Sequence, residues 1–204
     1  MPLYKNFSND KAQLLIWKYD EDEVLDINFL LEKENYDKVK GYHPKKVKEV
    51  LMVRKMLKQI LPNHKILYKE NGEPFLEPND FNISISHSFP LAAIGISKCK
   101  IGIDLERKKE KIKLVRHKFI LHENDFIDNE REVDYLTSIW TVKESLYKIH
   151  HSKHWSLKKH YDIQAFQPSE NFSVKARVYD HSFEDFFDVK VFEISDYYFS
   201  VVLE

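Results

Sequence analysis

Two carboxylates that interrupt an apolar segment are the first residues in this sequence that could do chemistry. In "IGIDLE" (residues 101–106) every second residue is a branched apolar one, so Asp104 and Glu106 would lie on the same face of a strand, about 7 Å apart. Carboxylates at that spacing can bind one hard cation. The simpler alternative is an edge strand with one solvated face. Both interpretations stay open on this segment alone.

A predicted helix further along the chain carries an acidic residue and a basic residue one turn apart. Within residues 133–151, apolar residues recur at helical spacing, and Glu144 and Lys148 in "WTVKESLYK" (140–148) would lie on the side opposite this apolar stripe. An ordinary surface ion pair would explain them. Trp140 stands one turn before Glu144, however, and a large aromatic residue beside charged groups favours a covered face or a cleft.

A third segment, "NISISHSF", ends a predicted strand with polar residues. Ser86 and His87 would lie in a loop anchored on the sheet, where a histidine flanked by hydroxyls can donate hydrogen bonds to phosphate oxygens. An exposed loop histidine without a role is the alternative. Adjacent Ser and His do not make a nucleophile and its base, because catalytic partners are rarely neighbours in sequence.

Strands and helices without a regular alternation must position these residues. "QLLIWKY" (13–19) predicts a strand, "HPKKVKEVLMVRKMLKQIL" (43–61) predicts an amphipathic helix with a basic face, and Asn71-Gly72 predicts a hairpin. Further strands precede and include "IGIDLE", and three more follow the helix at 133–151. This order favours an α+β protein of two packed subdomains, residues 1–99 and 100–204, each with one long amphipathic helix beside several strands.

Composition narrows the partners and the compartment. A net charge of -1 over 204 residues gives no global field for nucleic acid or a membrane surface. The single cysteine, Cys99, cannot form an internal disulfide, which suits a reducing compartment. We find no leader-like N-terminal pattern and no run of 18 apolar residues. We therefore expect a cytoplasmic protein that binds neither nucleic acid nor membranes.

Together, "NISISHS", "IGIDLE" and "WTVKESLYK" resemble the 4'-phosphopantetheinyl transferases, in particular the longer type similar to the surfactin-synthetase-activating enzyme. The resemblance implies a monomer of two similar, packed α+β halves with the active site between them. It implies transfer of the 4'-phosphopantetheine arm of coenzyme A to a serine of an apo acyl or peptidyl carrier protein, a holo-[acyl-carrier-protein] synthase activity that releases adenosine 3',5'-bisphosphate. Fatty acid, polyketide and peptide synthesis are the candidate pathways.

The resemblance also assigns roles to individual residues. It implies Mg²⁺ bound by Asp104, Glu106 and Glu144, with Glu144 also a candidate base for the serine hydroxyl, since a hydroxyl is a weak nucleophile at neutral pH. Lys148 is expected to contact phosphate during catalysis. The remaining expected site residues are Ser86 and His87 on the coenzyme A phosphates, Lys45 and Arg54 on its 3'-phosphate, and Glu123 as a further acid. A solvated basic helix face is the alternative for Lys45 and Arg54.

Other features concern the partner and departures from the family pattern. The basic stretch "RKKEKIKLVRHKF" after the metal strand makes Lys113 and Arg116 candidates for docking an acidic carrier helix, although a plain solvated stretch explains it equally. The chain has Glu73 in "NGEPF", where the family commonly has lysine, and "HHSKHWSL" replaces a glycine-rich loop. Two other functions stay open: another magnesium-dependent phosphotransferase, or a catalytically silent module that binds coenzyme A or a carrier.

Overall fold

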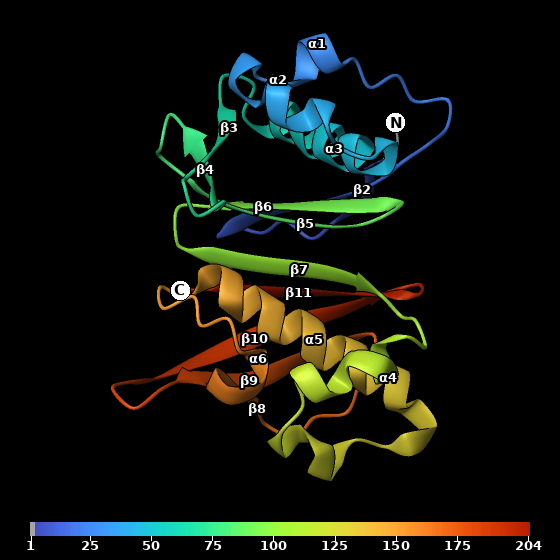
Figure 1. Ribbon diagram of the computed structural model, residues 1–204, viewed down its shortest axis with the longest axis vertical. Coiled ribbons are helices and arrows are strands. Elements are labelled where there is room, and N and C mark those ends of the chain that lie inside the picture. Colours follow the sequence, from blue (N-terminus) through green and yellow to red (C-terminus); the bar gives the residue numbers. More distant parts are fainter. Residues whose placement is uncertain (1–2) are drawn as a thin grey trace. The chain divides into compact units, whose positions relative to one another are not determined.

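The computed structural model describes residues 3–204, and the chain divides into two compact units. The first unit ends at Lys100 and the second comprises Ile101–Glu204. The predicted boundary, after residue 99, lies one residue before this division. Both units combine helices with antiparallel sheet, which confirms the predicted α+β class (Figure 1). No helix among the described residues is long and apolar enough to span a membrane.

The first unit is built on a four-stranded antiparallel sheet in the order β1-β2-β6-β5. Its strands are β1 (Leu3–Asn6), β2 (Ala12–Lys18), β5 (Asn82–Ser88) and β6 (Leu91–Ser97). A separate hairpin pairs β3 (Lys65–Tyr68) with β4 (Pro74–Glu77) across the predicted Asn71-Gly72 turn, where Gly72 has a φ of 84°. Its helices are α1 (Ile27–Leu30), α2 (Lys33–Lys40) and α3 (Pro44–Ile60).

The helix α3 lies across one face of this sheet (Figure 1). Its start is set locally, because the His43 side chain accepts a hydrogen bond from the Lys45 backbone N–H and Pro44 occupies the first turn. Its apolar stripe packs with β2 and β6 in one buried core that includes Met52, Met56 and Trp17. The basic residues of α3 are therefore held at fixed positions relative to the sheet.

The second unit has a five-stranded antiparallel sheet in the order β7-β11-β10-β9-β8. The strands are β7 (Ile101–Arg107), β8 (Tyr161–Ile163), β9 (Asn171–Tyr179), β10 (Glu184–Ile194) and β11 (Tyr197–Leu203). The helical segments are α4 (Ile112–Val115), η1 (Arg116–Lys118), η2 (His122–Phe126), η3 (Asn129–Arg131), α5 (Glu132–Ile149) and α6 (Leu157–His160).

The long helix α5 covers one face of this sheet, over β7 and β11 (Figure 1). Its buried residues Leu136, Ile139, Val142 and Leu146 join a core that continues through the inward-facing residues of the strands. The predicted apolar stripe is thus the packing face of the helix. This packing brings the two most informative motifs of the sequence, the β7 carboxylates and the α5 charges, against each other.

Candidate active site

The face of β7 that carries the two carboxylates is covered by α5. Gly102 lies on this face, and a Cβ atom there would stand 2.1 Å from the backbone carbonyl oxygen of Ser145. Only glycine permits so close an approach of a helix backbone to a strand. Although β7 is an edge strand of its sheet, the solvated-face interpretation of Asp104 and Glu106 is therefore wrong.

Lys148 on α5 pairs with Asp104 on β7. Its Nζ atom lies 2.8 Å from Asp104 Oδ1 and donates a second hydrogen bond of 3.0 Å to the backbone carbonyl oxygen of Ile103. Asp104 is only 4% exposed, whereas the Lys148 side chain retains 26% of its surface. Lys148 thus belongs to the carboxylate cluster, and a surface pair with Glu144 does not account for it.

Glu106 and Glu144 experience the same unfavourable environment. Burial, followed by the negative charge of Asp104, raises the pKa of each carboxyl to about 7, and hydrogen bonding from the Trp140 indole partly offsets the rise at Glu106. Trp140 itself packs edge-on against Phe119, with ring centroids 5.0 Å apart. This aromatic wall reduces solvent access to the cluster, as the sequence position of Trp140 suggested.

The cluster suits a hard divalent cation. It contains three carboxylates, and carboxylate oxygens are donors that Mg²⁺ prefers. Their mutual repulsion contributes to the raised pKa of Glu106 and Glu144, and a bound cation would relieve it. Asp104, Glu106 and Glu144 would hold the ion. Lys148 already places one positive charge at this point.

Glu123 lies in a different setting from that cluster. It is 1% exposed and forms an ion pair with Lys143, which is itself fully buried and donates a 2.7 Å hydrogen bond to the Phe119 carbonyl oxygen. The other Glu123 oxygen accepts from the backbone N–H of Leu121 at 3.0 Å. Burial lowers the pKa of Lys143, and the Glu123 charge opposes that shift. These contacts favour a structural role for Glu123 over the predicted place among the site acids.

In the first unit, His87 on β5 contacts two charged residues of α3. Its Nδ1 lies 3.1 Å from Glu49 Oε2, and its Nε2 is hydrogen-bonded to Lys46. The imidazole of His87 is thus held between an ammonium and a carboxylate of α3. These residues line a pocket of about 360 Å³ whose other polar and charged lining residues are Asn35, Lys38, Tyr42, Arg54 and Tyr68.

The two basic residues of α3 that were predicted to bind the 3'-phosphate, Lys45 and Arg54, contact other side chains of the first unit. Arg54 is 2% exposed, and its Nε donates a 2.7 Å hydrogen bond to Glu32 Oε2 in a buried ion pair. Lys45 is exposed, with its Nζ 5.7 Å from the centre of the Phe89 ring. Lys46, one residue further, is the lysine that reaches His87. Sequence reasoning missed it because helical periodicity alone does not show which lysine of a basic run faces the strand.

Ser86 and His87 are part of a strand, contrary to the loop that the sequence suggested. Both lie within β5 and pair with β6 opposite Ala93 and Ala92. Neighbouring residues of a strand point to opposite faces, so the Ser86 side chain projects away from the face on which His87 meets α3. The two predicted phosphate contacts therefore cannot approach an anion from the same face of this sheet.

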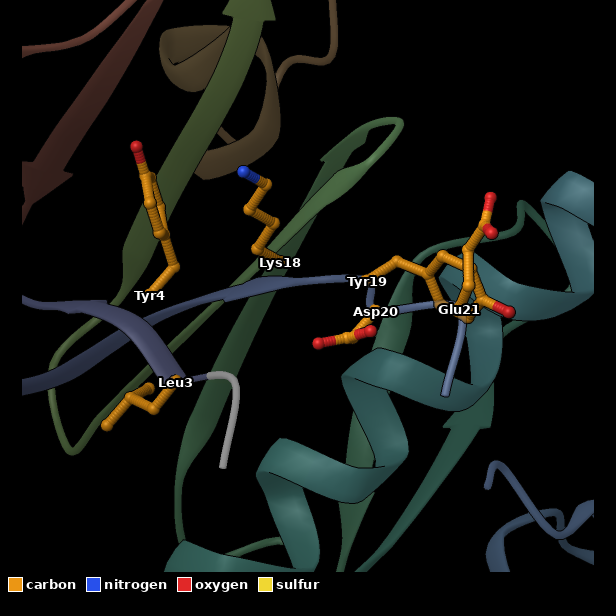
Figure 2. A pocket seen from close by; sticks show the side chains of 6 residues that line it. All are labelled: Leu3, Tyr4, Lys18, Tyr19, Asp20 and Glu21. Carbon is orange, nitrogen blue, oxygen red and sulfur yellow. The ribbon is translucent and has the colours of Figure 1, made fainter. Parts of the chain in front are cut away.

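A second pocket of the first unit, about 470 Å³, lies at the ends of β1 and β2 (Figure 2). Lys18 lies 5.6 Å from the centre of the Tyr4 ring, while Asp20 and Glu21 place two carboxylates at the rim. Acidic residues outnumber basic ones in its lining, whereas Lys38, Lys46 and Arg54 outnumber Glu49 in the pocket beside His87. It is therefore the weaker candidate for binding an anionic substrate.

The predicted docking residues pair with an acid of their own unit. Lys113 lies 3.4 Å from Glu132 Oε2 and 2.9 Å from Glu110 Oε2, and Arg116 pairs with Glu132 and with Asn124 Oδ1 at 2.6 Å. Their charges are partly neutralised there. Leu114 between them is 77% exposed.

The region that contains the carboxylate cluster matches a known family. Residues 100–202 match the model of the 4'-phosphopantetheinyl transferase superfamily, about half of the chain. The chain belongs to this superfamily. The match includes β7, α5 and all residues of the carboxylate cluster, whereas His87, Lys46 and the pockets of the first unit lie outside it.

The chain is also similar to a curated protein that is named as a 4'-phosphopantetheinyl transferase. Over 108 residues the chain is 38% identical to a protein named 4'-phosphopantetheinyl transferase gsp from Aneurinibacillus migulanus. The alignment covers 48% of this chain and 44% of the relative, so the chain matches less than half of that protein's length.

Proposed function

We propose that this chain transfers the 4'-phosphopantetheine arm of coenzyme A to a serine of an apo acyl or peptidyl carrier protein. The observation that carries the proposal is the cluster of Asp104, Glu106, Glu144 and Lys148 between β7 and α5, inside the region that matches the superfamily. We also propose that the chain acts in the cytoplasm, where its proposed substrates, coenzyme A and the carrier protein, would be present.

The residues of the cluster have complementary tasks in this reaction. Mg²⁺ held by Asp104, Glu106 and Glu144 would offset the negative charge of the diphosphate. Lys148 orients and neutralises a phosphate oxygen from the partly exposed side of the cluster. Glu144 is the proposed acceptor for the proton of the serine hydroxyl, because its carboxylate lies in the cluster beside the expected ion.

A direct assay tests the proposal. The full chain is incubated with an apo carrier protein, coenzyme A and Mg²⁺, and the carrier is followed by intact mass. A gain of one phosphopantetheine per carrier supports transfer. Binding of coenzyme A or carrier without a mass change would indicate a silent binding module, and neither result would favour a phosphotransferase with another substrate. Acyl and peptidyl carriers run in parallel identify the carrier class.

We predict that Lys46→Ala raises the Michaelis constant for coenzyme A by about tenfold. Lys46 contacts His87 at a pocket with further cationic residues, and a charge-assisted hydrogen bond to a phosphate contributes on the order of 1.5–3 kcal/mol. Lys45→Ala is the matched control, because Lys45 lies beside Phe89 and lines no part of this pocket. Equal effects of the two substitutions on steady-state kinetics would contradict this assignment.

We predict that Leu114→Asp weakens use of the carrier protein. Leu114 is 77% exposed beside the exposed Lys111, an arrangement that offers an acidic carrier helix both an apolar contact and a charge. Lys113 and Arg116 stay part of the proposed docking surface, but their pairing with Glu132 makes them poorer probes. The Michaelis constant for the carrier should rise about tenfold, with that for coenzyme A unchanged.

The control for this prediction is Val24→Asp, which alters an exposed apolar residue of the first unit. A carrier constant that stays the same in Leu114→Asp at low salt removes α4 from the interface. A parallel rise for coenzyme A would instead place α4 at the nucleotide.

A further inference from the structure

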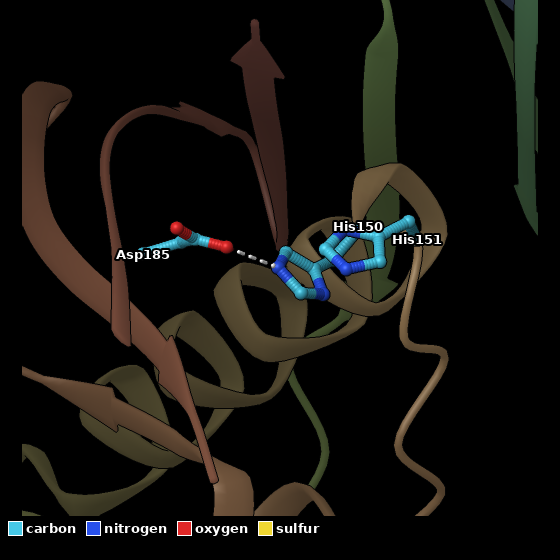
Figure 3. Close-up of side chains that lie close together, drawn as sticks. All are labelled: His150, His151 and Asp185. Carbon is cyan, nitrogen blue, oxygen red and sulfur yellow. Dashed lines mark hydrogen bonds and ion pairs between the residues drawn. The ribbon is translucent and has the colours of Figure 1, made fainter. Parts of the chain in front are cut away.

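A group of histidines lies just beyond the carboxyl end of α5, in the "HHSKH" stretch that replaces the family's glycine-rich loop. His150 is the C-cap residue of α5, and His151 follows it. Asp185 lies on β10, with its side chain directed toward His150 (Figure 3). One ligand-type atom from each of the three side chains lies within 4.8 Å of the others. None of the three belongs to the carboxylate cluster or to the pocket beside His87.

The pair formed by His150 and Asp185 is nearly at the spacing of two ligands on one metal ion. His150 Nε2 lies 3.0 Å from Asp185 Oδ2, and two ligands bound tetrahedrally at about 2.0–2.2 Å stand roughly 3.3 Å apart. His151 must approach by roughly 1–2 Å to complete the set. It lies in an exposed turn, where its ring can rotate, while the Asp185 side chain keeps 47% of its surface and leaves an entry path.

The surroundings of His150 already fix the orientation of its ring. The ring is 2% exposed and stacks on Phe183, with centroids 5.1 Å apart and planes inclined by 24°. His150 Nδ1 has two contacts with Ser152: it accepts a 3.2 Å hydrogen bond from the backbone N–H, and Oγ lies 2.7 Å away. Binding of a cation through Nε2 requires the tautomer with the proton on Nδ1, so the ion would replace the backbone donation by a hydrogen bond from Nδ1 to Ser152 Oγ. Such an outer hydrogen bond is the usual support of a metal-binding histidine.

The donor set distinguishes this group from the carboxylate cluster. Two imidazoles and one carboxylate suit Zn²⁺ and neighbouring transition metals, whereas Mg²⁺ prefers oxygen donors alone. We propose that His150, His151 and Asp185 form a second metal site, which binds a divalent transition-metal ion such as Zn²⁺ and leaves a fourth position for water.

An ion bound here would connect the end of α5 to β10. His150 follows Lys148 by two residues, and Asp185 is the second residue of β10, just after the turn of the β9–β10 hairpin. The ion would therefore hold the last turn of α5, which carries Lys148, against the sheet. Because a ligand that binds only the folded chain stabilises it, the melting temperature should rise with Zn²⁺.

The test uses the full chain without a polyhistidine tag, stripped of metal and kept in excess Mg²⁺ so that the carboxylates are occupied. Zn²⁺ is titrated by calorimetry, and Co²⁺ is followed by its visible absorption. We expect one equivalent to bind with a dissociation constant in the micromolar range or below. Asp185→Asn and His151→Gln should each weaken binding at least tenfold and reduce the Zn²⁺-dependent rise in melting temperature.

Two controls match these variants in chemistry. His122→Gln removes another exposed histidine, and Asp188→Asn removes an exposed aspartate of the same strand whose side chain points to the other face. Both should bind Zn²⁺ like the original chain. Circular dichroism confirms that each variant is folded.

Several outcomes would overturn the proposal. Failure to bind Zn²⁺ in the presence of Mg²⁺ leaves His150 and Asp185 as a simple hydrogen-bonded pair. Binding that survives both Asp185→Asn and His151→Gln places the ion elsewhere. Binding that disappears in Glu106→Gln instead assigns Zn²⁺ to the carboxylate cluster. Because the readout is metal affinity, each result is independent of whether the chain transfers phosphopantetheine.

Discussion

Asp104→Asn and Glu106→Gln should each lower the turnover of transfer by at least about a hundredfold. Both substitutions keep the shape of the side chain and remove one of the charges that would hold Mg²⁺. Loss of several kcal/mol of transition-state stabilisation corresponds to a hundredfold to thousandfold in rate. Turnover is measured at saturating coenzyme A and carrier, across a range of Mg²⁺ concentrations.

The loss should fall on turnover while the fold stays intact. Asp188→Asn on β10 is the control, because it removes an exposed aspartate without touching α5. Near-normal turnover of either cluster variant at saturating Mg²⁺ would sink the metal assignment. A variant that is inactive because it is unfolded would be recognised by its circular dichroism, and the conclusion would then rest on the other one.

Glu144→Gln and Glu106→Gln should make the chain more stable at pH 8 when divalent cations are absent. The pKa of each carboxyl is about 7 in the folded chain and 4.5 without the fold. Between these values the folded state binds more protons than the unfolded state, so stability falls as the pH rises. Above pH 7 the full cost is present. Because some solvent access remains, we expect a gain of about 1–2 kcal/mol per substitution.

Denaturant unfolding in EDTA at pH 4 and pH 8 checks this prediction. The difference between variant and original chain should nearly vanish at pH 4, below the unfolded pKa of 4.5, and the exposed control Glu170→Gln should change little at either pH. Mg²⁺ should stabilise the original chain at pH 8 far more than Glu144→Gln. Equal stability of the variant and the original chain at pH 8 would show that the cluster is not electrostatically strained.

The carboxylate cluster was largely predictable because two local periodicities define it. Alternation places Asp104 and Glu106 on one face of β7. Helical spacing put Glu144 and Lys148 opposite the apolar stripe, whereas in the structure both side chains meet the β7 carboxylates. The sequence does not show that α5 covers that face of β7. The clue is Gly102, since a glycine two residues before Asp104 on the same face indicates close approach of another backbone.

The first-unit residues were harder to predict because they depend on contacts between distant segments. Arg54 and Lys46 both stand on the basic helix, and only the packing of α3 decides that Arg54 meets Glu32 while Lys46 meets His87. In the second unit, Glu123 likewise forms its ion pair with Lys143, a residue twenty positions further along the chain. The opposite directions of Ser86 and His87 follow from strand alternation, but the predicted strand ended before these two residues.

The buried pair of Lys143 and Glu123 determines how α5 is rotated about its own axis. Successive residues of a helix point about 100° apart, so the direction of Lys143 also sets that of Glu144. Lys143 is held from outside the helix by Glu123 and by the Phe119 carbonyl oxygen. A turn of α5 that moved Glu144 away from Asp104 would leave a buried ammonium without its partner, which is strongly unfavourable. An ion pair that touches no substrate thereby keeps the proposed base aimed at β7.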